Sequence, residues 1–562
     1  MAKQDNDEEK ASSSSTTTPP DHLLKALDEL SEGSKFLWIV FCLTFTSLMF
    51  SGMQSMSYVF TTEIPPHWCE IPDLITANWT QEQIKNISSK DKCNKYDYDY
   101  EYLSQLGYEA ALNYVKRLGK RPNSSSCDSF SYGNTDRSSI VAEWNLVCDR
   151  ATDRANTYMA LALGKLLGAA VFGVIADKYG RKPTLVIGII MQIISGPLSA
   201  IVPWFWGYMF LRMVTGISLS AVGYPALTML TEASGSRNRQ WLGIAFNIGF
   251  PVGIIMLCGV AMFFYSWRQL QMAISIVTLI LLFHAWYMPE SPRWLISQNR
   301  RKEAEKIVTK FYGELEETTA IPMIESNDDN NKKDLINGDG PIKDTFVKNK
   351  LMGFTIIYTN PELRSRLFIM WISWLSSSIS YWALALNADN FTQDRRIYVL
   401  IMALTEIPAY ILPSIMLMFM GRRQAGALLY LIGAICLLCI LGIPKTNNNA
   451  IMAVAVIGRF CLAAVYGIII LYTSELFPTV VRNSAIGTTS VMAQVGTVSA
   501  PYIADLLGAI AWWAPSTICG ALALVAGLSS LALPETRGRP LADTVEEETA
   551  PDREGVSFRK CC

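Results

Sequence analysis

Histidine is scarce in this chain, with three residues in 562, and no stretch has the spacing of a metal site or of a Walker-type phosphate loop. The three residues, His22, His67 and His284, are far apart in the sequence, and no nucleophile or acid–base constellation accompanies them. We therefore expect neither an enzyme nor an ATP-driven pump, and we expect no resident cofactor or metal.

Charge is also low. Charged residues make up 17% of the chain, the formal net charge is −1, and the basic residues form short clusters instead of one patch, so nothing indicates nucleic acid binding. Hydrophobic residues make up 50% of the chain, and uncharged runs repeatedly reach the ~20 residues that a bilayer span requires. The composition predicts a polytopic protein embedded in a lipid bilayer.

Six apolar runs precede a charged central stretch and six follow it, which predicts an all-α fold. The predicted transmembrane helices lie at about 36–60, 155–176, 183–203, 206–228, 240–262, 268–289, 367–388, 397–419, 424–443, 450–472, 485–508 and 513–533. Basic residues such as Arg181, Arg422 and Arg482 fall on the same side as the central stretch. The positive-inside rule makes that side cytoplasmic, together with both termini.

These spans divide the chain into seven parts. They are a disordered cytoplasmic tail (1–35), the first transmembrane helix (36–60), an extracellular loop domain (61–154), transmembrane helices 2 to 6 (155–290), a cytoplasmic linker (291–366), transmembrane helices 7 to 12 (367–533) and a second cytoplasmic tail (534–562). The first tail lacks a basic region with a cleavage site, so we do not interpret it as a signal peptide. Cys561 and Cys562 at the end of the second tail are either acylated or part of a plain tail.

The predicted loop domain combines cysteines with glycosylation sequons, which is typical of an oxidising, extracellular setting. The candidate disulfide cysteines are Cys69, Cys93, Cys127 and Cys148, and the candidate glycosylation sites are Asn78, Asn86 and Asn123. Four cysteines allow three pairings, and the sequence leaves all three open. A fourth sequon, at Asn390, lies too near the membrane for us to expect modification.

Residues at the ends of the spans recur roughly 245 positions further on, which indicates an internal repeat of one half of the chain. Glu232 corresponds to Glu475, for example, and two arginines inside apolar runs, Arg212 and Arg459, also lie about one repeat apart. An unpaired guanidinium at such a depth costs at least ~2.5 kcal/mol. Repeated halves with charges inside the membrane predict a transporter.

The run from Gly173 to Lys182, GVIADKYGRK, resembles the loop signature of the major facilitator superfamily. The segments EWNLVCD at 143–149, PESPRWL at 289–295, ELFPT at 475–479 and LPET at 533–536 resemble the organic cation, carnitine and anion transporter family. The matches run from about residue 140 to 545. The loop domain departs from the family, because it has four cysteines where organic cation carriers commonly have six.

This resemblance implies two pseudo-symmetric six-helix bundles that rock about a site at the membrane midplane, with one monomer sufficient for transport. Charged residues at the cytoplasmic ends of both halves are then expected to latch the inner mouth when it closes. These gate residues are Asp177, Arg181, Glu232, Arg237, Glu290, Arg293, Arg422, Arg423, Glu475, Arg482, Glu535 and Arg537. The alternative is that they only cap helices and set topology.

Glu406 lies inside the eighth predicted span, where an ionised carboxylate is tolerated mainly if it faces water or a cation. We expect it to bind the substrate, and organic cation carriers resemble the chain here with an acid, a hydrophobe and a proline. The alternative is a structural pair with Arg459. Gln494 is neutral at a position where cation carriers typically place an aspartate and anion and carnitine carriers an arginine, which favours a cation site that also admits zwitterions.

Aromatic residues on several spans are candidates for the wall of the site. A ring face stabilises an ammonium by ~0.5 to 2 kcal/mol. The candidate substrate-binding residues, besides Glu406 and Gln494, are Trp374, Tyr381, Phe250, Asn247, Tyr224 and Tyr466, and Trp382 shares the helix of the first two. For each ring, helix packing or interfacial anchoring is the alternative.

The sequence therefore predicts a plasma-membrane transporter of small organic cations or zwitterions, such as choline, monoamines, carnitine-like betaines or amine conjugates. Uptake driven by the membrane potential is expected, because a monovalent cation gains ~2.3 kcal/mol per 100 mV. Coupling to H⁺ or Na⁺ stays open. Two alternatives are an organic anion exchanger and a non-transporting, receptor-like sensor on the same fold.

Overall fold

The computed structural model describes residues 35–118, 121–133, 137–234, 239–298, 300–312, 355–388 and 394–538. Several sequence predictions fall outside these ranges. They concern the gate residue Arg237, the sequon at Asn390, the pair Cys561 and Cys562, nearly all of the first tail and much of the linker.

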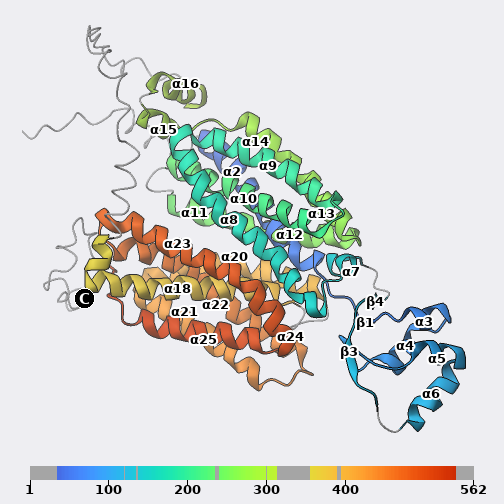
Figure 1. Cartoon of the computed structure of the whole chain (residues 1–562). Helices are drawn as coiled ribbons and strands as arrows, with labels where there is room; N and C mark the ends of the chain where they lie inside the picture. Colours follow the sequence, from blue (N-terminus) through green and yellow to red (C-terminus); the bar gives the residue numbers. More distant parts are fainter. Residues whose placement is uncertain are drawn as a thin grey trace, which may run out of the picture.

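The described helices form two groups, and each group comes from one half of the chain (Figure 1). The first half contains α2 (Lys35–Thr61), α8 (Ala151–Tyr179), α9 (Arg181–Ile201), α10 (Phe205–Ala233), α11 (Arg239–Asn247), α12 (Gly249–Phe263), α13 (Trp267–Val277) and α14 (Leu281–Tyr287). The second half contains α18 (Pro361–Leu386), α20 (Arg395–Phe419), α21 (Arg422–Cys439), α22 (Asn448–Leu476), α23 (Thr479–Tyr502), α24 (Gly508–Ile510) and α25 (Ala514–Ser530).

Ten of the described helical segments are long and apolar enough to cross a membrane. They coincide with the first ten predicted spans. Helices α23 and α25, of 24 and 17 residues, occupy the last two predicted positions but do not meet the same criterion of length and hydropathy. The fifth predicted span corresponds to Trp241–Phe263, in which a single turn residue, Ile248, separates α11 from α12 while helical backbone hydrogen bonds continue on both sides of it.

Small residues let the helices of each half approach closely. A Cβ added to Gly164 of α8 would lie 2.1 Å from the backbone oxygen of Met213 on α10, and one added to Gly216 would lie 2.1 Å from that of Leu161. Helices α2 and α12 meet in the same way, since a Cβ at Gly253 would lie 1.9 Å from the Met49 oxygen. This small-residue packing is typical of helices that associate in a bilayer, where hydrophobic burial contributes little.

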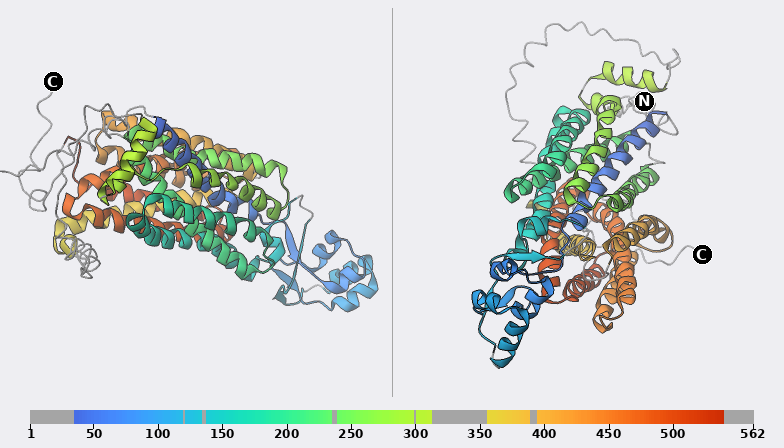
Figure 2. Two further views of the ribbon diagram at one scale, coloured as in Figure 1. Left: turned by 90° about the horizontal axis from the view of Figure 1, so that it is seen from above. Right: turned by 90° about the vertical axis from the view of Figure 1, so that its right-hand side faces the viewer.

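The residues between α2 and α8 form the loop domain, which extends beyond one end of the helical body in all views (Figures 1 and 2). It contains short helices and two antiparallel two-stranded sheets. They are β1 (His67–Cys69) paired with β4 (Phe130–Tyr132), β2 (Asn94–Tyr96) paired with β3 (Ser124–Ser126), α3 (Pro72–Thr76), α4 (Gln81–Ser88), α5 (Tyr100–Leu106), α6 (Tyr108–Arg117) and α7 (Ile140–Trp144). We call this side of the molecule the loop-domain end.

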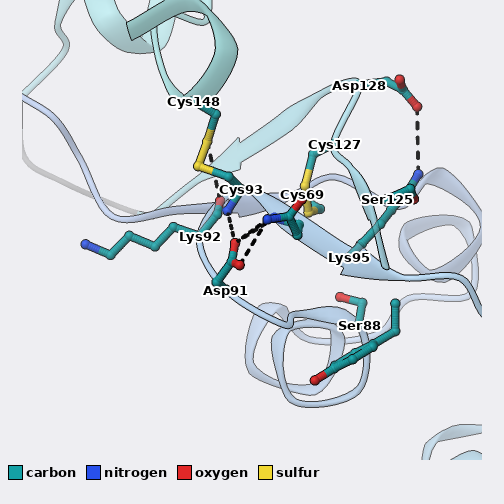
Figure 3. The surroundings of a disulfide bond; sticks show 12 residues. Cys69, Ser88, Asp91, Lys92, Cys93, Lys95, Ser125, Cys127, Asp128 and Cys148 are labelled. Atoms are coloured by element: carbon teal, nitrogen blue, oxygen red, sulfur yellow. Dashed lines mark hydrogen bonds and ion pairs between the residues drawn. A yellow bond between two sulfur atoms is a disulfide. The ribbon is translucent and has the colours of Figure 1, made fainter. Parts of the chain in front are cut away.

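Two disulfides cross-link the loop domain, Cys69–Cys127 and Cys93–Cys148 (Figure 3). The structure thus has one of the three possible pairings. The second bond links the sheet region to the turn that precedes α8. The imidazole of His67 lies within 4.8 Å of the sulfurs of Cys93 and Cys148, but those sulfurs are bonded to each other and do not act as thiolate ligands.

Helix α7 fixes the loop domain to the first half. The carboxylate of Glu143 accepts a hydrogen bond from Trp267 Nε1 at 2.8 Å and pairs with Arg268. Trp144 packs against Tyr208 and Trp267, with ring centroids 5.2 and 5.5 Å apart. At the opposite side of the molecule, α15 (Pro292–Ser297) and α16 (Arg301–Tyr312) follow the first half, and we call that side the linker end.

The close contact between α8 and α10 predicts a large effect of a single methyl group. We expect Gly164→Ala to destabilise the protein by about 1–3 kcal/mol, because the backbone oxygen of Met213 must move. Gly173→Ala on the same helix is the control, since a Cβ there meets nothing within 4 Å. Thermal unfolding in detergent would measure the difference, and equal melting temperatures for the two variants would contradict the packing argument.

Candidate functional site

Glu406 of α20 is 2% exposed, and its carboxylate contacts three polar groups. Its carboxylate receives hydrogen bonds from the hydroxyls of Tyr381 at 2.5 Å and Tyr410 at 2.6 Å, and it forms an ion pair with Arg459 Nη2 at 3.1 Å. Arg459, on α22, also donates to the backbone oxygen of Tyr381 at 2.9 Å. The structural pair that the sequence left open as an alternative is therefore present, while substrate binding by Glu406 stays a prediction.

The aromatic side chains of the two halves meet around Trp382 of α18. Its ring lies 5.1 Å from that of Tyr381, 5.7 Å from that of Tyr158 on α8 and 6.3 Å from that of Phe250 on α12. Tyr58 of α2 extends the cluster, with its ring 5.2 Å from that of Tyr158. Two of the predicted wall residues, Tyr381 and Phe250, thus reach the same tryptophan from opposite halves.

The remaining wall candidates have their own contacts, and none of the ring contacts described for them reaches Trp382. The Trp374 and Tyr466 rings are 5.4 Å apart within the second half, and Trp374 Nε1 donates to the Thr473 hydroxyl at 3.0 Å. The hydroxyl of Tyr224, a residue that is 45% exposed, lies beside the Gln494 amide of α23. Asn247 is exposed, and its amide donates to the Gly243 oxygen at 2.8 Å.

Lys165 of α8 was not among the sequence candidates. Its ammonium donates to Ser55 Oγ at 2.8 Å and lies 5.1 Å from the centre of the Trp382 ring. Within the described residues, no ion pair of Lys165 is present. The signal was in the sequence, because Lys165 is the one charged residue inside the predicted span 155–176.

The second intramembrane arginine, Arg212 of α10, is fully buried. Its Nη1 donates to Ser57 Oγ at 3.2 Å, while Nε and Nη2 have no hydrogen-bond partner among the described residues. Arg212 and Arg459 stand about one repeat apart in the sequence, but an acid accompanies only Arg459 in the part of the chain that the structure covers.

The predicted gate charges of the first half pair with one another at the linker end. Arg181 lies 2.9 Å from Glu232 and 3.4 Å from Asp177. The Glu290 carboxylate accepts the backbone N–H groups of residues 181 and 182, and Gly180, with a φ of 113°, leaves room for it. Burial raises the pKa of Glu290, and these N–H donors oppose the shift.

The second half repeats this arrangement. Arg422 lies 3.0 Å from Glu475, and the Glu535 carboxylate accepts the backbone N–H groups of Arg422 and Arg423 at 2.8 and 3.2 Å. Arg537 donates hydrogen bonds to backbone oxygens at the end of α20. Arg482 donates one to the backbone oxygen of Phe477. Each of these contacts lies within one half, which matches the helix-capping alternative, and latching between the halves stays a prediction.

The polar contacts at the loop-domain end do cross between the halves. Arg154 of α8 forms a 2.6 Å ion pair with Asp505, which lies in the single π-helical turn (Ile503–Leu507) after α23, and Tyr58 donates to the same carboxylate at 2.5 Å. The hydroxyl of Tyr502 donates to the Asn156 side chain at 2.6 Å. These contacts hold the loop-domain ends of the two halves together.

Comparison with known proteins gives the chain a context. The model of the sugar (and other) transporter family matches residues 96–547. An organic cation transporter protein of Drosophila melanogaster is 33% identical over 550 residues, which cover 94% of both chains. Solute carrier family 22 member 6 of Rattus norvegicus is 30% identical over 87% of both chains, and organic anion transporter 3 of Sus scrofa is 27% identical over 88% of this chain and 87% of its own.

Solved structures of the xylose transporter XylE from E. coli have a similar fold. An inward open form has a TM-score of 0.56, and a partially occluded inward open form has one of 0.58. Both are 15% identical in sequence and cover 90% of this chain, and the alignments cover 98% and 100% of the respective XylE chains. The predicted, mostly helical major facilitator fold is confirmed, and ten of its twelve predicted spans meet the length and hydropathy criterion.

The buried pair Glu406–Arg459 predicts strong coupling between its members. Glu406→Gln leaves a guanidinium buried without its charge partner, so we expect a loss of about 3–5 kcal/mol of stability. Adding Arg459→Gln should recover part of this loss. Thermal unfolding would measure all three variants, with Glu303→Gln in the exposed Arg300–Glu303 pair at the start of α16 as a control of small effect. Strictly additive losses in the double variant would contradict the assignment.

The ion pair between Arg154 and Asp505 predicts that one substitution loosens the closed loop-domain end. In Asp505→Asn, we expect a thiol reagent that does not cross membranes to label an added Ser55→Cys at least about tenfold faster from that side, because a buried pair between the halves is lost. The control is Asp153→Asn, which breaks the Arg150–Asp153 pair within one half at the same end. Equal labelling rates in both variants would show that the pair does not close this end.

Proposed function

Since the chain belongs to the organic cation, carnitine and anion transporter family of the major facilitator superfamily, we propose that it carries small organic cations or zwitterions across the plasma membrane. Members of this family are membrane transporters and not enzymes, so the chain is not an enzyme. The candidate substrates are choline, monoamines, carnitine-like betaines and amine conjugates. In this proposal the halves alternate access to a central site, a monomer is sufficient, and both termini are cytoplasmic.

The observation that carries this proposal is the aromatic cluster around Trp382. Its rings come from α2, α8 and α12 of the first half and from α18 of the second half. Ring faces attract an ammonium group through their quadrupole, and they do so more strongly where water is excluded. A cation held there touches both halves, which is the requirement for a substrate that influences their relative movement.

Electrostatics around the cluster favour recognition of a substrate ammonium by ring faces. Glu406 is neutralised by Arg459 and two hydroxyl groups, so it offers a cation less attraction than an unpaired carboxylate would. Gln494 adds no charge. We therefore favour aromatic recognition of the ammonium over recognition by a free acid, and we keep zwitterions within the proposed substrate class.

The second candidate is an organic anion exchanger, which Lys165 favours because no acid among the described residues pairs with it. One relative is an organic anion transporter and another an organic cation transporter, so the similarities leave this choice to experiment.

A receptor-like sensor is the third candidate, and it differs in binding a solute without accumulating it. Facilitated entry driven by the membrane potential is our proposal for energy coupling, with H⁺ or Na⁺ coupling as the alternative.

We expect cells that express the protein to accumulate radiolabelled choline or a monoamine, and to accumulate more when the interior is made more negative. Carnitine has no net charge, so its facilitated uptake should not depend on potential. Trp382→Leu should raise the KM for choline about two- to thirtyfold through the loss of a ring face. Phe368→Leu, at a 59% exposed aromatic position on the same helix, is the control.

Two outcomes would contradict the proposed function. Uptake confined to an aromatic carboxylate, with no accumulation of choline, a monoamine or carnitine, would establish the anion exchanger instead. Ligand-dependent thermal stabilisation without accumulation of any of these solutes would establish the sensor.

A further inference from the structure

Lys165 is a cation in the membrane interior that the proposed function does not use. It lies near the middle of α8, where the residue as a whole is partly buried, and its ammonium contacts Ser55 of the first half and the Trp382 ring of the second. A lysine ammonium has three donors, and the one hydrogen bond in the structure uses one of them. The group thus retains donors for a ligand at the boundary between the halves.

The repeat makes Lys165 the counterpart of Glu406. Each lies fifteen residues before the glycine that precedes the next helix, which is Gly180 before α9 in the first half and Gly421 before α21 in the second. In the second half, this position carries the acid that neutralises Arg459. In the first half, the same position carries a second positive charge beside an arginine, so the sign is inverted.

Arg212 provides an independent observation on the same stretch of α2. It is fully buried, two of its three nitrogens lack a hydrogen-bond partner among the described residues, and no acid pairs with it there. Its one bond goes to Ser57, two residues from the Ser55 that holds Lys165. Two cations are therefore attached to one stretch of α2 without a counterion from the described part of the chain, and a buried charge without a partner is costly.

A ligand with a carboxylate supplies the missing negative charge. Lysine binds a carboxylate through a charge-assisted hydrogen bond, and the Trp382 ring that Lys165 now faces belongs to the aromatic cluster. A carboxylate at Lys165 therefore leaves an ammonium at the other end of the same molecule within reach of the ring faces. The long-range field of Arg212 strengthens the site without direct contact.

We propose that Lys165 binds the carboxylate of the transported molecule and makes the carrier prefer zwitterions over simple amines. This inference rests on the proposed function. The position is a specificity determinant in the first half of the chain, separate from Glu406 and Gln494. Arg212 acts through its charge and is a positioning residue.

Choline and carnitine are a matched pair of probes, because both carry a trimethylammonium group and only carnitine carries a carboxylate. The full chain would be expressed in cells as wild type, Lys165→Met and Lys165→Arg, with Lys178→Met as a control at an exposed position of the same helix. We expect the ratio of the carnitine KM to the choline KM to rise about ten- to hundredfold in Lys165→Met. Lys165→Arg should retain part of the preference, and Lys178→Met all of it.

A second measurement separates this inference from the proposed function. Thermal stabilisation of the purified protein by carnitine, choline and benzoate reports binding without transport. Stabilisation by carnitine and benzoate that is lost in Lys165→Met supports the carboxylate site even if no solute accumulates. Choline accumulation with an unchanged KM ratio in Lys165→Met overturns the site and leaves the carrier intact, and so does a variant whose only change is in the pH dependence of uptake.

Discussion

The constraint on which this molecule depends is the cost of charge in a membrane interior. An isolated ion there is expensive, and a protein reduces the cost with an opposite charge, with hydrogen bonds or with access to water and ligand. The second half uses the first two means at Glu406 and Arg459, where every acceptor faces a donor. The first half has Arg212 and Lys165, whose side-chain hydrogen bonds in the described part of the chain go only to serine hydroxyls and whose charges face aromatic rings instead of an acid. The two halves share a fold and differ in electrostatics at its centre.

This difference arises on two halves that share the same backbone contacts at their linker ends. In each half a carboxylate, Glu290 or Glu535, accepts the first backbone N–H groups of a helix, where the helix dipole favours negative charge. Glycines bring neighbouring helices into backbone contact. Such halves move as units more readily than they deform, because close-packed interfaces have discrete arrangements. The contacts that hold the ends of the two halves together, such as Arg154 with Asp505, are then the ones that a change of state must break.

The sequence predicted the parts of this molecule that follow from local pattern. Apolar length located the helices, and the motif GVIADKYGRK indicated the charge network around Arg181. The disulfide pairing and the partners of Asp505 depend on contacts between distant residues, which periodicity does not encode. Glu406 was identified as a buried acid, but whether Arg459 or a ligand neutralises it is decided by helix packing.

Lys165 shows what a substrate has to do in such a carrier. A ligand shifts the balance between two states only by its difference in affinity for them. Lys165 belongs to the first half and faces a ring of the second, so its present contact exists only while the two halves lie together at this depth. A carboxylate that takes the ammonium from Trp382 replaces a contact between the halves with a contact to the ligand, whereas a ligand held by one half alone has no such effect. The position of the charge at the boundary, more than its presence, therefore allows binding to influence the orientation of the carrier.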